Sequence, residues 1–103
     1  MARIALIVEF EVRPGCQAAL LTLMRAHAAA CLAEEPGLER FDVLEVLDAE
    51  GRPDPGRVLL YEVFVDAAAR QAHWGFPRHE ATKAAFAPLI FGRSSRLCRL
   101  GAD

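Results

Sequence analysis

Apolar and polar residues alternate along the first part of the chain. Every second residue from 4 to 12 is apolar: Ile4, Leu6, Val8, Phe10 and Val12. Successive side chains of a strand point to opposite faces, so this period of two predicts a strand over residues 3–12. Pro14 and Gly15 come next, and both residue types interrupt strand pairing, so the strand ends before them.

From residue 16 onward the apolar positions recur every three or four residues. The stripe consists of Leu20, Leu23, Met24, His27 and Cys31. This spacing places the stripe on one face of a helix that runs from Cys16 to about Glu34. Pro36 ends the helix, because a proline disfavours the helical conformation in the residue before it.

Two more strands are predicted after the helix. In residues 38–47, Phe41 and Val43 fall on one face of a strand. Residues 48–56 contain two prolines and two glycines, which predicts a hairpin loop. Residues 57–65 are rich in apolar side chains on both faces, which is typical of a strand that is buried on both sides.

Two short helices and a last strand complete the chain. Asp66 is a favourable N-cap for a helix that reaches about Trp74. A second helix begins near Pro77, because proline is tolerated in a first turn, and ends near Pro88. Residues 90–100 have the pattern of a strand.

The predicted order is β-α-β-β-α-β, with the second helix divided in two. This is the order of the ferredoxin-like split motif, so we expect an α+β fold with a four-stranded antiparallel sheet. The chain has 103 residues, and a typical domain holds roughly 100–200, so we expect residues 1–103 to form one domain.

Composition excludes several classes of protein. The net charge of −2 gives no basic footprint for nucleic acid. No segment approaches the roughly 20 apolar residues of a membrane span, and the N-terminus lacks the apolar core of a signal peptide. Cys16, Cys31 and Cys98 form no C-x-x-C pair, so we interpret them as small buried hydrophobes in a cytoplasmic protein.

Candidate chemistry gathers near the two short helices. His73 and Trp74 lie near the end of the first, and His79, Thr82 and Phe86 recur at helical spacing in the second. A face with an imidazole, a hydroxyl and a ring suits a pocket for a flat aromatic compound. Histidine can remove a phenolic proton near neutral pH, and Trp74 can bound the pocket. The alternative is that both histidines are partly exposed helix residues and that Trp74 fills the core.

Glu62 lies within the apolar third strand and needs a partner, because a carboxylate is almost never fully buried unpaired. One candidate is Arg40 on the preceding strand, which would make the pair structural. The other is His73, whose ring Glu62 would orient and make more basic. Phe64 shares the face of Glu62, and Tyr61 lies on the opposite face, to which we assign a dimer interface.

Three segments taken together resemble the antibiotic biosynthesis monooxygenase family. They are the turn and strand in residues 34–44, the strand and acidic cap in residues 60–66, and the paired helices in residues 72–86. The resemblance rests on their order and spacing, and it extends from the first strand to about Leu89.

The resemblance implies a dimeric α+β barrel in which two four-stranded sheets pack face to face. Each subunit keeps its own pocket between its sheet and its helices. Some relatives oxidise quinols or aromatic polyketides without metal or flavin, others degrade haem, and others act on small signalling molecules without oxygen. The family therefore shares a fold and not one reaction.

The function that we expect is a cofactor-independent monooxygenase, an oxidoreductase that uses molecular oxygen on a small aromatic or quinol-type substrate. His73 and Glu62 are the expected catalytic residues. The expected substrate-binding residues are Trp74, His79, Phe86, Arg40 and Phe64. The alternatives are an isomerase or degradative enzyme for a small carbonyl metabolite, which would use the same acid–base residues, and a non-catalytic domain that binds a small ligand.

We expect no metal, flavin or haem in the protein. A glycine-rich phosphate loop after a strand is missing, and so is a metal-binding spacing of His and Cys. Haem-degrading relatives carry a ligand histidine roughly where this chain has Lys83, and lysine is a poor ligand for haem iron.

Overall fold

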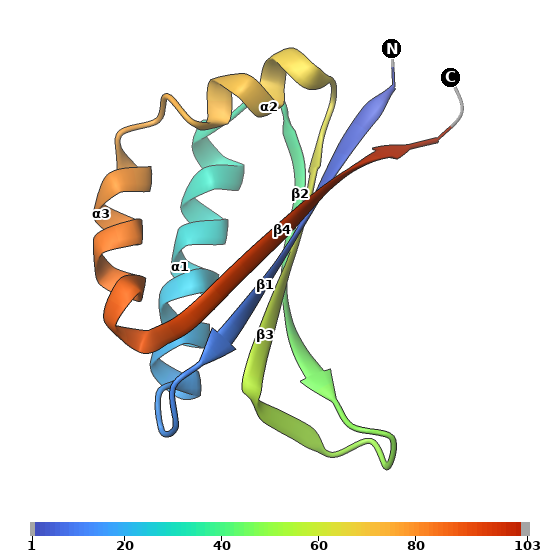
Figure 1. Ribbon diagram of the computed structural model, residues 1–103. Coiled ribbons are helices and arrows are strands. Elements are labelled where there is room, and N and C mark those ends of the chain that lie inside the picture. Colours follow the sequence, from blue (N-terminus) through green and yellow to red (C-terminus); the bar gives the residue numbers. More distant parts are fainter. Residues whose placement is uncertain (1, 102–103) are drawn as a thin grey trace.

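The strands of the chain form one antiparallel sheet, and the helices cover one of its two faces (Figure 1). The structure is a computed structural model that describes residues 2–101. In chain order the elements are β1 (Arg3–Val12), α1 (Gln17–Glu34), β2 (Leu38–Leu47), β3 (Pro53–Phe64), α2 (Ala67–His73), α3 (Arg78–Phe86), the 3-10 helix η1 (Ala87–Leu89) and β4 (Ile90–Leu100). The predicted α+β fold, with a divided second helix, is confirmed.

The order of strands across the sheet is β2-β3-β1-β4, so β1 pairs with both β3 and β4. Leu6 lies opposite Glu62 of β3, and Phe10 lies opposite both Val58 of β3 and Arg93 of β4. Residues paired across antiparallel strands point to the same face. The register therefore places Glu62 and Arg93 on the helix-covered face together with Leu6 and Phe10.

The core lies between this face of the sheet and α1. Its largest fully buried side chains are Phe10, Phe64, Leu20, Met24, Val8, Val58 and Cys31. They come from alternate positions of β1 and β3 and from the predicted stripe of α1, because these positions point at one another across the interface. Each large apolar side chain buried in this way contributes roughly 1.5–3 kcal/mol.

The third strand begins earlier than expected, at Pro53 and not at residue 57. The carboxylate of Asp48 accepts hydrogen bonds from the backbone N–H groups of Glu50 and Arg52, both at 2.9 Å. These bonds close the turn within a few residues, so strand pairing resumes with Leu47 opposite Pro53. A proline is compatible with the first position of a strand, where no ladder hydrogen bond is needed from it.

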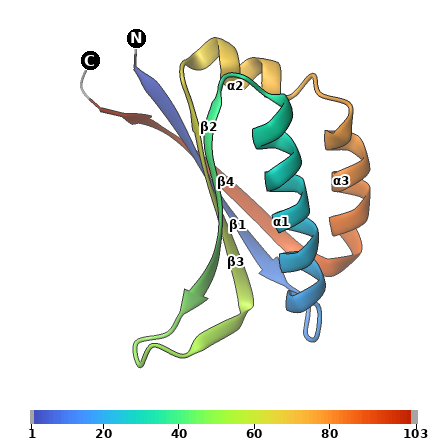
Figure 2. The same ribbon diagram turned by 180° about the vertical axis from the view of Figure 1, so that it is seen from behind.

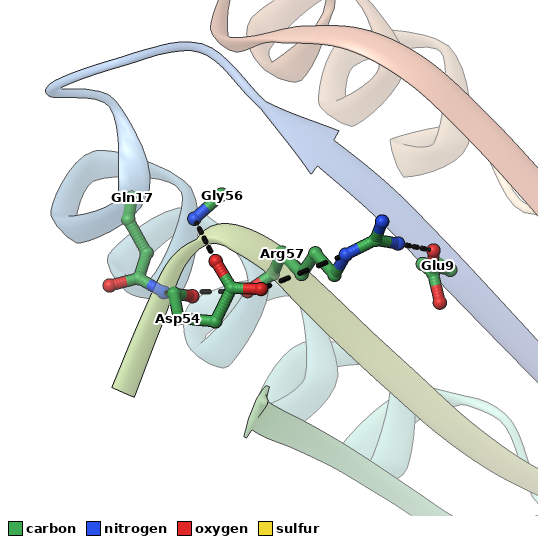
Figure 3. A network of polar contacts seen from close by, with 5 residues as sticks. All are labelled: Glu9, Gln17, Asp54, Gly56 and Arg57. Carbon is green, nitrogen blue, oxygen red and sulfur yellow. Dashed lines mark hydrogen bonds and ion pairs between the residues drawn. The ribbon is translucent and has the colours of Figure 1, made fainter. Parts of the chain in front are cut away.

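A polar network ties the start of β3 to the rest of the fold (Figure 3). The side-chain amide of Gln17, at the beginning of α1, donates to the backbone oxygens of Asp54 at 3.0 Å and Arg57 at 3.3 Å. Asp54 accepts from the backbone N–H of Gly56 at 2.9 Å, and Arg57 forms an ion pair with Glu9 of β1. The irregular start of the strand is therefore anchored to both α1 and β1.

The other face of the sheet carries no helix in the described part of the chain (Figure 2). The register assigns to it a run of largely apolar side chains on the two central strands: Ala5, Ile7, Leu59, Tyr61 and Val63. Among residues 2–101, no helix is long and apolar enough to cross a membrane.

Candidate functional site

A cavity of about 210 Å³ lies between the helix-covered face of the sheet and the helices. Its apolar lining includes Leu6, Val8, Phe10, Leu60, Met24 and Phe86. The sheet supplies the floor, and α1 and α3 supply walls. Polar side chains gather at the end of the cavity nearest α2, where all three histidines of the chain line it.

Most of the predicted site residues meet at this cavity. Glu62, His73, Trp74, His79 and Phe86 all line it. His79, Thr82 and Phe86 all line the cavity, so they share one face of α3 as their spacing predicts. The ring of Phe86 also packs against that of Phe10 in β1, with the two ring centroids 5.1 Å apart. Trp74 is half-exposed at the cavity and does not fill the core.

Arg40 does not pair with Glu62, and it does not line this cavity. The register places Arg40 opposite Val63, on the face of the sheet away from Glu62. Its guanidinium bonds Asp42 at 2.5 Å and lies over the ring of Tyr61. The predicted Arg40–Glu62 pair is therefore wrong, because side chains alternate between the faces of a strand.

Phe64 is fully buried behind the site and does not line the cavity. Its ring packs edge-on against the ring of His73, with centroids 5.2 Å apart. Phe64 thus supports the imidazole from the core side.

His73 is held between two buried glutamates. Its Nδ1 lies 2.5 Å from Oε1 of Glu35, and its Nε2 lies 3.5 Å from Oε1 of Glu62. The three residues are 3–4% exposed. A hydrogen bond that involves a charged group is stronger than a neutral one, and more so away from water. The Glu35 bond therefore fixes the orientation of the imidazole.

The local structure around Gly37 brings these residues together. Glu35 is the C-cap of α1, and its backbone N–H still bonds the oxygen of Cys31. Gly37 follows, and a Cβ at this position would overlap the Cβ of Ala69 in α2. The absence of a side chain lets α2 pack close to the turn, and the first residues of α2 are fixed by Asp66, which accepts from the N–H of Ala69 at 2.8 Å.

Glu62 holds its proton at neutral pH. Burial raises the pKa of Glu62 to about 8, and the negative charge of Glu35 acts in the same direction. Arg93 and Arg70 lower this pKa in part. Oε1 of Glu62 is buried and makes no hydrogen bond within residues 2–101.

The other two histidines are neutral side chains near the same end of the cavity. The ring of His79 stands edge-on to that of His73, with centroids 3.9 Å apart, and burial lowers the pKa of His79. Burial is the largest cause that lowers the pKa of His27 to about 4, and protonation of His79 would lower it in the same direction. Nδ1 of His27 lies 3.1 Å from the hydroxyl of Thr82, so the predicted core histidine of α1 also borders the cavity.

Cys31, Glu35 and His73 bring three atoms of metal-binding types within 4.8 Å of one another. A thiolate, a carboxylate and an imidazole are ligands that zinc accepts. Burial and a hydrogen bond to Glu35 raise the pKa of Cys31 to about 12, so the thiol keeps its proton. In this arrangement the three side chains form a hydrogen-bonded network.

Glu35 and His27 are the site residues that sequence reasoning missed. The sequence places Glu35 in the turn that follows the first helix and His27 on the apolar stripe of that helix. His27, Cys31 and Glu35 are spaced four residues apart, which places all three on the buried stripe of α1. An acidic residue that continues a buried stripe was the signal for Glu35.

The comparison with family models agrees with this geometry. The model of the antibiotic biosynthesis monooxygenases matches residues 3–85, which include every element up to most of α3. The chain therefore belongs to the antibiotic biosynthesis monooxygenase family. No curated protein matches the chain at a significant level.

Solved structures share the fold across nearly the whole chain. A Caulobacter crescentus protein assigned to the antibiotic biosynthesis monooxygenases has a TM-score of 0.87 and 20% identity, covering 98% of this chain and 92% of its own. A Nitrosomonas europaea protein of unknown function has a TM-score of 0.78 and 28% identity, covering 100% and 93%. SnoaB of Streptomyces nogalater, a cofactor-independent oxygenase, has a TM-score of 0.78 and 19% identity, covering 98% and 95%.

Proposed function

We propose that the chain is a cofactor-independent monooxygenase that oxidises a small aromatic or quinol-type substrate with molecular oxygen. The observation that carries the proposal is the Glu35–His73–Glu62 arrangement at the polar end of a largely apolar cavity. Membership of the family and the fold shared with SnoaB support it.

The first step is removal of a proton from a substrate hydroxyl by Nε2 of His73. Glu35, bonded to Nδ1, stabilises the imidazolium that results. Glu62 is protonated at neutral pH, because its pKa is raised to about 8, and its O–H can donate to the new oxyanion. A neutral carboxyl group at this position also avoids repulsion between two negative charges.

The deprotonated ring is electron-rich and reacts with oxygen directly. The substrate supplies all the electrons: one oxygen atom becomes a carbonyl of the product, and the other leaves as water with two hydrogens from the substrate. Apolar walls suit this reaction, because they bind the ring and keep bulk water from the reactive anion. Oε1 of Glu62 and Nε2 of His79, both buried without a hydrogen bond in residues 2–101, are groups that a substrate hydroxyl can satisfy.

Oxygen uptake with candidate quinols tests the proposal. We expect uptake with wild-type protein, and we expect His73→Ala to lower turnover by about 10²–10⁴-fold, the scale of a positioned acid–base group. The same substitution leaves buried Glu35 without its partner, so it should also lower the free energy of unfolding by roughly 1–3 kcal/mol. Turnover must therefore be normalised to the folded fraction, measured by circular dichroism.

Gln71→Ala is the matched control, because Gln71 is an exposed residue of the same short helix. It should leave both turnover and stability close to wild type. Turnover of a carbonyl metabolite without oxygen uptake would favour the isomerase alternative. Unchanged turnover in the folded fraction of His73→Ala would remove His73 from the mechanism.

A further inference from the structure

The cavity has a charged end as well as a hydrogen-bonding end. Arg93 of β4 and Lys83 of α3 line it together with Glu80. Neither Arg93 nor Lys83 makes a hydrogen bond or ion pair within residues 2–101. Because Glu62 is protonated at neutral pH, these two cations exceed the single negative charge of Glu80 among the side chains that line the cavity, so the lining attracts anions.

The register of the sheet separates the two ends. Glu62 pairs with Leu6 of β1, whereas Arg93 pairs with Phe10. Four residues along a strand span about 13 Å. Val8 lies between the two rows and supplies apolar floor. The backbone positions of the floor therefore run from that of Glu62, over apolar side chains, to that of Arg93. The guanidinium of Arg93 is still close enough to Glu62 to lower its pKa in part.

Helix α3, which covers the cavity, has its polar and cationic side chains in the same order as the sheet. The ring of His79 stands against that of His73, at the Glu62 end. Lys83 follows one helical turn later, about 6 Å along the axis. Phe86 then packs on Phe10, in the row of Arg93. The sheet and α3 thus each place a hydrogen-bonding side chain at one end of the cavity and a cation toward the other.

We propose that the substrate is a hydroxylated aromatic carboxylate, whose carboxylate binds Arg93 and Lys83 and whose hydroxyl group reaches Glu62, His73 and His79. The ring occupies the apolar middle of the cavity. The identity of the reacting hydroxyl rests on the proposed function, whereas the carboxylate subsite rests on the cavity alone. The neutral state of Glu62 at pH 7 supports the proposal, because its raised pKa removes a negative charge from the cavity lining. The buried carboxylate of Glu35 does not line the cavity and is bonded to His73.

The single tryptophan of the chain provides the measurement. Trp74 lines the cavity and its ring lies 5.7 Å from that of His79, so a bound ligand should change its fluorescence. The two probes are 4-hydroxyphenylacetate and its neutral analogue 4-hydroxyphenylacetamide, titrated anaerobically at pH 7. We expect the carboxylate to bind about tenfold more tightly than the amide, because charge-assisted hydrogen bonds exceed neutral ones.

Arg93→Gln should remove most of this preference, and Lys83→Gln should reduce it. Arg96→Gln is the matched control: it removes the same charge from the same strand, but Arg96 pairs with Ile7 and points to the other face of the sheet. The control should keep the preference of the wild type. All three positions are exposed, so the variants are expected to fold.

Three results would overturn the proposal: equal binding of the two probes by the wild type, equal loss of preference in Arg93→Gln and Arg96→Gln, or no quenching by either probe up to millimolar concentration. The binding assay needs no oxygen. A carboxylate preference without oxygen uptake from any quinol would therefore refute the proposed reaction and leave this subsite standing. Oxygen uptake from quinols without a preference for the carboxylate probe would support the proposed reaction and refute the carboxylate subsite.

Discussion

Two buried glutamates flank one imidazole at the centre of the site, and their roles differ. Glu35 bonds His73 closely, at 2.5 Å, whereas Glu62 stands 3.5 Å from the other ring nitrogen. Like charges this close cannot both remain ionised without cost, and burial raises that cost. Burial, followed by the charge of Glu35, raises the pKa of Glu62 to about 8, so Glu62 carries a proton at neutral pH.

This raised pKa predicts a pH dependence of stability. The folded protein holds a proton on Glu62 that the unfolded chain, with an ordinary carboxyl pKa near 4.5, releases. Between these values the native state binds more protons, so the contribution of Glu62 to stability falls as pH rises toward 8. Glu62→Gln cannot titrate, so its free energy of unfolding relative to wild type should increase from pH 5 to pH 8 in urea titrations.

The charged groups around Glu62 do not change the direction of this pH dependence, because its pKa remains raised in their presence. His73 and Glu35 lie beside it, and Arg93 and Arg70 act on it from β4 and α2. Glu50→Gln, in the exposed β2–β3 turn, is the control and should follow the wild type at every pH. Parallel curves for Glu62→Gln and wild type would contradict the assigned protonation.

The sequence was sufficient to predict which residues gather at the site. It was not sufficient to predict which of these residues pair with one another. Helical spacing was sufficient to predict that His79 and Phe86 share a face, because the period of a helix fixes that geometry. The partner of Glu62 was not fixed in this way, since Arg40 and His73 were both plausible by type. The register decides it, because Arg40 opposes Val63 on the far face. Glu35 enters only through the close packing of α2 on Gly37, a tertiary contact.

At the scale of elements, boundaries were predictable wherever local chemistry ends an element. The predicted strands over residues 3–12 and 38–47 match β1 and β2. The start of β3 was not predictable from its prolines and glycines, because the side chain of Asp48 closes the turn within a few residues. Turn chemistry of this kind depends on one carboxylate and not on average composition.

The short helix α2 depends on its N-cap. Seven residues are too few for a helix to be stable alone, and α2 carries both His73 and Trp74 close to its end. Asp66→Ala removes the acceptor of the Ala69 N–H and should lower the free energy of unfolding by about 1 kcal/mol in urea titrations. Asp66→Asn keeps an acceptor oxygen and should lose much less. Equal losses in the two variants would show that the cap bond does not carry the effect.

At the scale of the whole molecule, the fold places its helices on one face and leaves the other face bare (Figure 2). The helix-covered face makes the core and the cavity. The opposite face combines exposed apolar side chains such as Ile7 and Leu44 with ion pairs such as Glu9–Arg57. The sequence predicted the fold class because the order of elements restricts the arrangement, but the separation of the two cavity ends needed the strand register.

The bare face leads to the last prediction, that two copies of the chain associate through it as a homodimer. An uncovered sheet face with apolar side chains at its centre is typical of an interface, and the mixture with charged residues suits a specific one. Ile7 lies in the middle of the central strand and is more than one-third exposed, at 37%. Sedimentation at micromolar concentration should give a dimer for the wild type. Ile7→Arg should shift it to monomer, because an unpaired charge at the centre of an interface is costly to bury. Leu32→Arg, at an exposed position on α1, introduces the same charge on the helix side and should remain dimeric. A wild-type protein that sediments as a monomer, or a dimer that both variants preserve, would contradict association through this face.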